Sequence, residues 1–163
     1  MEKKLDDTQL YRYERKFIVP KSLENNLTCL ILNNPANFSE IYSRRNINNI
    51  YLDTLDFTCL KDNISGLATR KKVRLRWYGS LYGQIEPTLE FKIKSGLVGR
   101  KETFKLPSFS LDPYINIQTF RTIVNTADLP ENIRNELLLL DFTLLNSYSR
   151  QYFLSFYKNL ILT

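Results

Sequence analysis

Residues 70–79 read RKKVRLRWYG, and cationic and apolar side chains alternate along this stretch. The cations occupy every second position: Arg70, Lys72, Arg74 and Arg76. The apolar residues stand between them: Val73, Leu75 and Trp77. Successive side chains of a β-strand point to opposite faces of its sheet, so this alternation predicts a strand with one apolar and one cationic face. Like charges gathered on one face are unfavourable unless something neutralises them.

The same alternation recurs in three other predicted strands. In TLEFKIKSG (residues 88–96) one face would carry Glu90, Lys92 and Lys94. In GRKETFKLP (99–107) the corresponding set is Lys101, Thr103 and Lys105. In YRYERKFIV (11–19) it is Arg12, Glu14 and Lys16. The connections GSLYG and SGLVG have the length and glycine content of hairpin loops, so the three later strands are expected to be neighbours.

A cationic face on four strands favours a polyanionic ligand. For any single strand the alternative is a solvated face, or lysines that protect an exposed edge from aggregation. The four faces together hold only two glutamates, so a bound polyanion is the expected compensation. The aromatic residues lie on the apolar side: Phe17, Trp77, Phe91 and Phe104. Because base stacking needs exposed aromatic side chains, phosphate groups are favoured over nucleic acid.

Composition limits the chemistry further. The 163 residues, 43% of them hydrophobic, are expected to form one domain over residues 1–163. The net charge of +6 agrees with an anionic partner. The absence of histidine excludes Ser-His-Asp and Cys-His catalysis and His-ligated zinc. Cys29 and Cys59 are expected to be buried thiols, and without an apolar run of about 18 residues the chain is expected to be cytoplasmic.

The predicted class is α+β, an antiparallel sheet flanked by helices. Helices are predicted over 23–32, with Ser22 as its cap, 55–65, ended by Gly66, 114–127 and 131–140. Strands are predicted over 11–19, 46–53, 69–79, 87–95, 98–106, 146–156 and from residue 160 onward. Residues 33–46 are expected to be a loop or a weak strand.

Two glutamates stand among the cations. Glu14 and Glu90 are candidate ligands of a divalent metal, which would itself bind phosphate oxygens. Internal salt bridges to Lys16 and Lys92 explain the two glutamates at least as well. Nearby, Arg74 could give forked contacts to phosphate oxygens, as could Arg76.

Six segments occur in an order that resembles a known family: YERKF, NIYLDTLDF, VRLRWYG, LEFKIKSG, RKE and YSRQYF. The family is the polyphosphate polymerase domain of the vacuolar transporter chaperone (VTC) proteins, part of the triphosphate tunnel metalloenzymes that include the CYTH proteins. The resemblance covers nearly the whole chain. It implies an antiparallel β-tunnel flanked by helices, whose basic lining holds a triphosphate with Mn²⁺ or Mg²⁺. VTC members transfer the γ-phosphoryl group of ATP to a growing polyphosphate chain.

The resemblance also implies roles for particular cations. The implied phosphate ligands are Lys16, Arg74, Arg76, Lys92, Lys101 and Arg150, and the first three are the expected catalytic residues. Lys94 and Lys105 join this set from the alternation alone. One departure is Arg12, which stands where CYTH relatives carry the first glutamate of E-x-E-x-K. A second is that family members continue past the strand beginning at LILT, so a tunnel made by residues 1–163 is expected to be incomplete.

The leading interpretation is therefore an ATP–polyphosphate phosphotransferase. A tripolyphosphatase or nucleoside triphosphatase of the same fold is one alternative, and a non-catalytic polyanion-binding module is another. The expected partners are ATP and polyphosphate or triphosphate, with no nucleic acid and no transmembrane segment. A membrane partner protein, or self-association of the chain, is left open.

Overall fold

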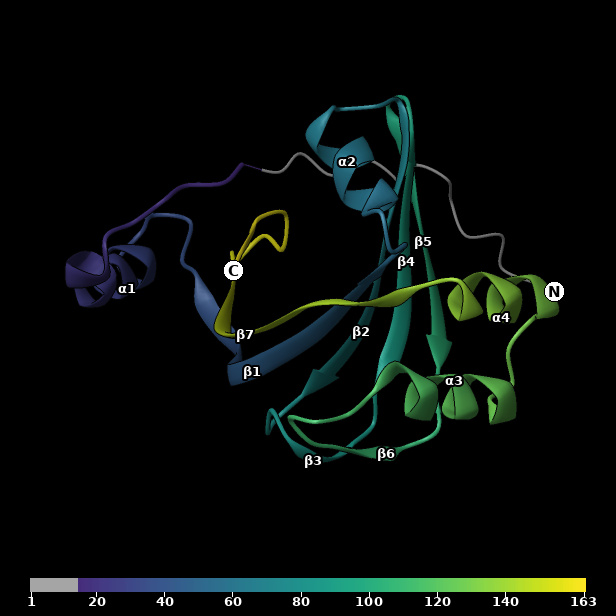
Figure 1. Cartoon of the computed structure of the whole chain (residues 1–163). Coiled ribbons are helices and arrows are strands. Elements are labelled where there is room, and N and C mark those ends of the chain that lie inside the picture. The colour runs from purple at the N-terminus through teal and green to yellow at the C-terminus, as the bar shows by residue number, and fades with distance from the viewer. Residues whose placement is uncertain (1–14) are drawn as a thin grey trace, which may run out of the picture. The chain divides into compact units, whose positions relative to one another are not determined.

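The computed structural model describes residues 15–163, which divide into two compact units (Figure 1). One unit holds residues 15–39 and 153–162. The other holds Glu40–Tyr152 and contains most of the strands. The alternating segments at 70–79, 88–96 and 99–107 all belong to this second unit.

A curled antiparallel sheet organises the structure, in the strand order β5-β4-β2-β1-β7-β8. Its strands are β1 (Ser39–Asp53), β2 (Thr69–Tyr78), β4 (Thr88–Ser95), β5 (Val98–Lys105), β7 (Asp141–Leu154) and β8 (Ile161–Leu162). With the helices, this sheet makes the chain α+β, as predicted. In the described part of the chain the sheet is a half-barrel, whose order begins at β5 and ends at β8.

The strands β2, β4 and β5 lie within one residue of their predicted bounds, because their alternation is uninterrupted. By contrast, β1 and β7 begin earlier than predicted, at Ser39 and Asp141. Polar side chains pair between the two: Ser149 Oγ donates to Asn46 Oδ1 at 2.6 Å, and Arg44 Nη2 donates to Gln151 Oε1 at 3.1 Å. Such cross-strand pairs offset the low strand preference of these polar residues.

The hydrophobic core lies on one face of the sheet. Strand residues such as Leu75, Trp77 and Phe91 pack there against helices α3 (Ile117–Thr126) and α4 (Glu131–Leu138). Phe120 and Leu137 are fully buried at the centre of this contact. The aromatic side chains Trp77, Phe91 and Phe104 therefore lie on the apolar side, as the sequence predicts.

Two three-residue strands were not predicted. β3 (Gly83–Ile85) lies inside the expected hairpin connection and pairs with β6 (Phe109–Leu111). Ile85, Phe109 and Leu111 are buried and belong to the core. Segments this short carry no readable alternation. The helix predicted at 55–65 is α2 (Thr58–Ile64), and Gly66 follows it with φ of +68°.

In the other unit the 3-10 helix η2 (Lys21–Leu23) leads into α1 (Glu24–Leu32). The two residue pairs between the end of β7 and β8 are Phe153–Leu162 and Leu154–Ile161. Ser22 does not cap the helix, because η2 extends the helical segment past it and Leu23 occupies the cap position without a side-chain bond. Cys59 is buried in α2, but Cys29 is exposed, so the prediction of two buried thiols is wrong for Cys29.

The predicted strand at 11–19 is not formed in its described part. Residues 15–20 have no regular secondary structure. Alternation gives a segment the capacity to form a strand, but a strand also needs a neighbour to accept its backbone hydrogen bonds. Separately, none of the helices in the described residues is both long enough and apolar enough to cross a membrane.

Replacement of Leu137 by alanine is expected to lower the free energy of unfolding by roughly 2–5 kcal/mol, because it opens a cavity in the core. Urea denaturation followed by circular dichroism measures this change. Leu139→Ala is the matched control, since Leu139 lies two residues away and is 74% exposed. A change larger than about 0.5 kcal/mol in the control, or none in Leu137→Ala, would contradict the packing described above.

Candidate functional site

The pairing of β2, β4 and β5 places the predicted cations on one face. Arg70 lies opposite Lys94, Lys72 opposite Lys92, and Arg74 opposite Glu90. Lys92 in turn lies opposite Lys101, and Thr88 opposite Lys105. We call this surface the cation face; its charged members are Arg70, Lys72, Arg74, Arg76, Glu90, Lys92, Lys94, Lys101 and Lys105. The three strands thus contribute eight cations and one carboxylate to it.

Three lysines form a row across the cation face. Lys72, Lys92 and Lys101 are directly opposite one another on three adjacent strands. Like charges in directly opposite positions destabilise a sheet. Within the part of the chain that the structure describes, neither Lys72 nor Lys92 forms an ion pair, and only Lys101 has an acidic partner. An anion bound across this row would remove the repulsion.

Glu90 lies at the centre of the cation face and its side chain is 6% exposed. Its Oε2 accepts from Arg74 Nε at 2.8 Å and lies 2.7 Å from Arg74 Nη2. Its Oε1 lies 2.6 Å from Lys101 Nζ and 3.7 Å from Arg76 Nη1. Glu90 therefore forms internal salt bridges, as one interpretation of the sequence predicted. The partners of Glu90 lie on the neighbouring strands and do not include Lys92.

The pKa values of this cluster follow from its contacts. Burial alone raises the pKa of Glu90, but the hydrogen bonds from Lys101 and Arg74 and the charges of Arg74 and Arg76 outweigh it and lower the pKa. Burial likewise lowers the pKa of Arg74, and its bonds to Glu90 and Tyr51 outweigh this and raise it. The lowered pKa of Glu90 and the raised pKa of Arg74 both favour the charged forms that make this ion pair.

Two side chains of β1 orient the arginines. Tyr51 Oη accepts from Arg74 Nη1 at 3.2 Å. Asn49 Oδ1 accepts from Arg76 Nε at 3.0 Å, and Asn49 Nδ2 donates to Asn146 Oδ1 of β7 at 2.9 Å. Asn49 is fully buried. Sequence reasoning missed these orienting residues, although two adjacent asparagines inside a strand are an uncommon signal.

Arg150 lies on β7 and is surrounded by aromatic rings. Asn146, Tyr148 and Arg150 occupy alternate positions of this strand, so they share the side that contacts Asn49. The Arg150 guanidinium lies 5.2 Å from the ring centre of Tyr148 and 5.9 Å from that of Tyr152. Arg150 thus belongs to the same side of the sheet as Arg76, and among the described residues it makes cation–π contacts instead of an ion pair.

The two first-strand candidates, Lys16 and Glu14, stay predictions. Lys16 belongs to the other compact unit, where it is exposed, and Glu14 lies outside the described residues. No group of three His, Cys, Asp or Glu side chains suited to a metal occurs among residues 15–163. The Glu90 carboxylate is already bonded to cations. The metal ion, Mn²⁺ or Mg²⁺, therefore stays a prediction.

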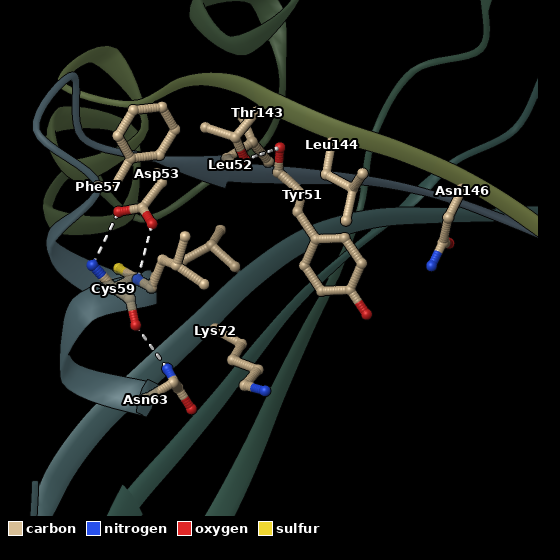
Figure 2. Close-up of a pocket in the computed structure, with 12 residues that line it drawn as sticks. Tyr51, Leu52, Asp53, Phe57, Cys59, Asn63, Lys72, Thr143, Leu144 and Asn146 are labelled. Atoms are coloured by element: carbon tan, nitrogen blue, oxygen red, sulfur yellow. Dashed lines mark hydrogen bonds between the residues drawn. The ribbon is translucent and has the colours of Figure 1, made fainter. Parts of the chain in front are cut away.

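A pocket of about 460 Å³ lies next to the cation face (Figure 2). It is formed by β1, β2, α2 and β7, and it shares Tyr51 and Lys72 with the neighbourhood of the cations. Asp53 stabilises its wall by accepting from the backbone N–H groups of Cys59 and Leu60, both at 2.8 Å, at the start of α2. Burial and the Asp53 charge raise the pKa of the Cys59 thiol to about 11, so this thiol is not a nucleophile near neutral pH.

Comparison with known proteins places the chain in a family. The model of the VTC domain matches residues 11–160, nearly the whole chain, and the chain therefore belongs to the VTC domain family. This membership associates it with polyphosphate-related function in general. No curated protein matches the chain.

Replacement of Glu90 by glutamine is expected to lower the free energy of unfolding by about 2 kcal/mol at pH 7, because three cations lose their shared counter-charge. The folded-state pKa of Glu90 is lowered, so its contribution is present at neutral pH and is lost as the pH falls through that pKa. The difference between wild type and Glu90→Gln should shrink below about pH 4.

Urea denaturation of both proteins between pH 3 and pH 7 measures this difference. Glu102→Gln is the control, since Glu102 lies on the opposite face of β5 and pairs with the exposed Arg100. A pH-independent difference for Glu90→Gln, or an equal effect of Glu102→Gln, would refute a stabilising role for the buried carboxylate.

Proposed function

We propose that this VTC-domain protein binds ATP and polyphosphate on the cation face and transfers the γ-phosphoryl group of ATP to a growing polyphosphate chain. The observation that carries the proposal is the excess of cations on three adjacent strands, held around one buried glutamate. Family membership supports the same class of ligand.

The spacing of the cations suits linked phosphates better than a single anion. Neighbouring strands lie about 4.8 Å apart, so the row Lys72, Lys92 and Lys101 extends over roughly 10 Å. Arg74 and Arg76 follow Lys72 at alternate positions of β2, so they lie beside this row on the same face. A ligand with several connected phosphates can contact the row and the arginines together. In this proposal Lys94, Lys105 and Arg150 extend the surface along the polymer.

Contacts within the protein fix the direction of both arginines. Arg74 is held by Glu90 and Tyr51, and Arg76 by Asn49. Each guanidinium has five N–H donors, so both retain donors for phosphate oxygens after these contacts. Donors fixed in advance need no reordering when negative charge develops in the transition state, which is why they stabilise it effectively.

The proposed reaction needs alignment and charge stabilisation more than acid–base groups. An acceptor phosphate is already anionic, so no general base has to deprotonate it, and the absence of histidine is no obstacle. The cations would place the acceptor oxygen in line with the γ-phosphorus and spread the charge of the transferred group. Lys16 remains a proposed ligand on the basis of the family pattern. No step here requires a metal bound by the described residues.

Alanine replacement of Arg74 or Arg76 is expected to reduce polyphosphate synthesis from ATP by roughly 30- to 1,000-fold, equivalent to about 2–4 kcal/mol of lost transition-state stabilisation. The measurement is polymer formation, resolved by gel electrophoresis, with circular dichroism to verify folding. Mn²⁺ and Mg²⁺ are each included, since the resemblance implies one of them.

The matched control is Arg100→Ala, which removes the same charge from the opposite face of β5, where Arg100 is 70% exposed. It should leave the rate nearly unchanged. Release of orthophosphate or pyrophosphate without polymer would show that the protein is a hydrolase and not a polymerase. Tripolyphosphate binding without turnover would leave a polyanion-binding module. Wild-type rates in folded Arg74→Ala and Arg76→Ala would remove the cation face as the site.

A further inference from the structure

The pocket beside the cation face has a chemical character that a phosphate chain does not use. Its volume of about 460 Å³ lies in the range of small-molecule sites, about 300–1,000 Å³. Apolar walls come from three elements: Leu60 of α2, Val73 of β2 and Leu144 of β7. Tyr51 also lines the pocket, and its ring lies below Leu144 in the view of Figure 2. Phosphates have no apolar surface to place against such walls.

The pocket also has polar groups suited to the edge of a heterocycle. Asn146 Oδ1 is bonded to Asn49, whereas the Asn146 amide nitrogen has no partner within the described part of the chain. Asn63 donates its amide nitrogen to the carbonyl oxygens of Cys59 and Lys71, at 2.7 and 2.9 Å. Its amide oxygen accepts no hydrogen bond from the described residues. One free donor group and one free acceptor therefore line an otherwise apolar space.

Two residues that line this pocket also belong to the cation face or contact it. Lys72 begins the lysine row, and Tyr51 accepts from Arg74. A ligand in the pocket would thus lie next to positive charge on one side. The ligand that this combination fits has a flat, partly apolar ring with hydrogen-bonding edges, attached to a chain of phosphates.

We propose that this pocket binds the nucleoside part of the phosphoryl donor, while the lysine row and the arginines bind its phosphates. This inference rests on the proposed function, because it assumes that phosphates occupy the cation face. It adds a preference that the cation face alone cannot give: a nucleoside triphosphate should bind more tightly than tripolyphosphate of similar charge. An acyl chain fits less well, because it would leave the amide groups of Asn63 and Asn146 unsatisfied.

The test compares the affinities of ATP and tripolyphosphate by isothermal titration calorimetry, at one ionic strength and with the same divalent cation. Wild type should bind ATP more tightly than tripolyphosphate. Leu144→Ala and Leu60→Ala each remove part of a wall, and both residues are half exposed, so folding should be retained. Each is expected to weaken ATP binding about tenfold and to leave tripolyphosphate binding within about twofold.

Leu145→Ala is the matched control, because Leu145 is the next residue of β7 and does not line this pocket. It should change neither affinity. Equal affinity of wild type for ATP and tripolyphosphate, or equal weakening of both ligands by Leu144→Ala, would overturn the nucleoside site but leave the proposed function standing. Binding of neither ligand by wild type would overturn both.

Discussion

The buried carboxylate of Glu90 is the interaction on which the candidate site depends. It lies on β4, the middle strand of three, and bonds to Arg74 on one neighbour and Lys101 on the other. A carboxylate with so little exposure to water must be matched by cations. The same bonds that satisfy Glu90 fix the direction of the cations, and the remaining lysines keep their charge available. Glu90 therefore neutralises only part of the positive charge of the cation face, and this face still attracts anions strongly.

The alternation in the sequence predicted the cation face because side-chain direction in a strand is a local property with a period of two residues. It did not predict the partners of Glu90. Lys92 is close in sequence, but residues two apart on a strand are separated by about 6.8 Å, whereas directly opposite residues on neighbouring strands lie about 5 Å apart. Pairing across strands decided the contacts. The roles of Asn49 and Tyr51 were missed for the same reason, since they depend on β1 lying beside β2.

The segment before Pro20 shows where a periodic pattern is insufficient. Residues 15–19 belong to the segment 11–19, which was predicted to be a strand from its alternation, yet they form no strand in the described chain. The difference is that β2, β4 and β5 are joined by short connections, which bring each strand to its partner at little entropic cost. No such connection ties the N-terminal segment to a neighbour in sequence. The short connections, more than the alternation itself, are therefore the reason that β4 and β5 form as predicted.

The contrasting faces of β2 also bear on how the sheet assembles. A pairing shifted by one residue would turn Arg74 and Arg76 toward α3 and α4 and would expose Leu75 and Trp77 to water. Placing guanidinium groups in an apolar interior without acidic partners is strongly unfavourable. A hairpin with a shifted register would therefore be unstable and would separate before the helices could pack on it. Charges suited to a phosphate chain in the finished protein thus also discriminate, during folding, against wrongly aligned strands.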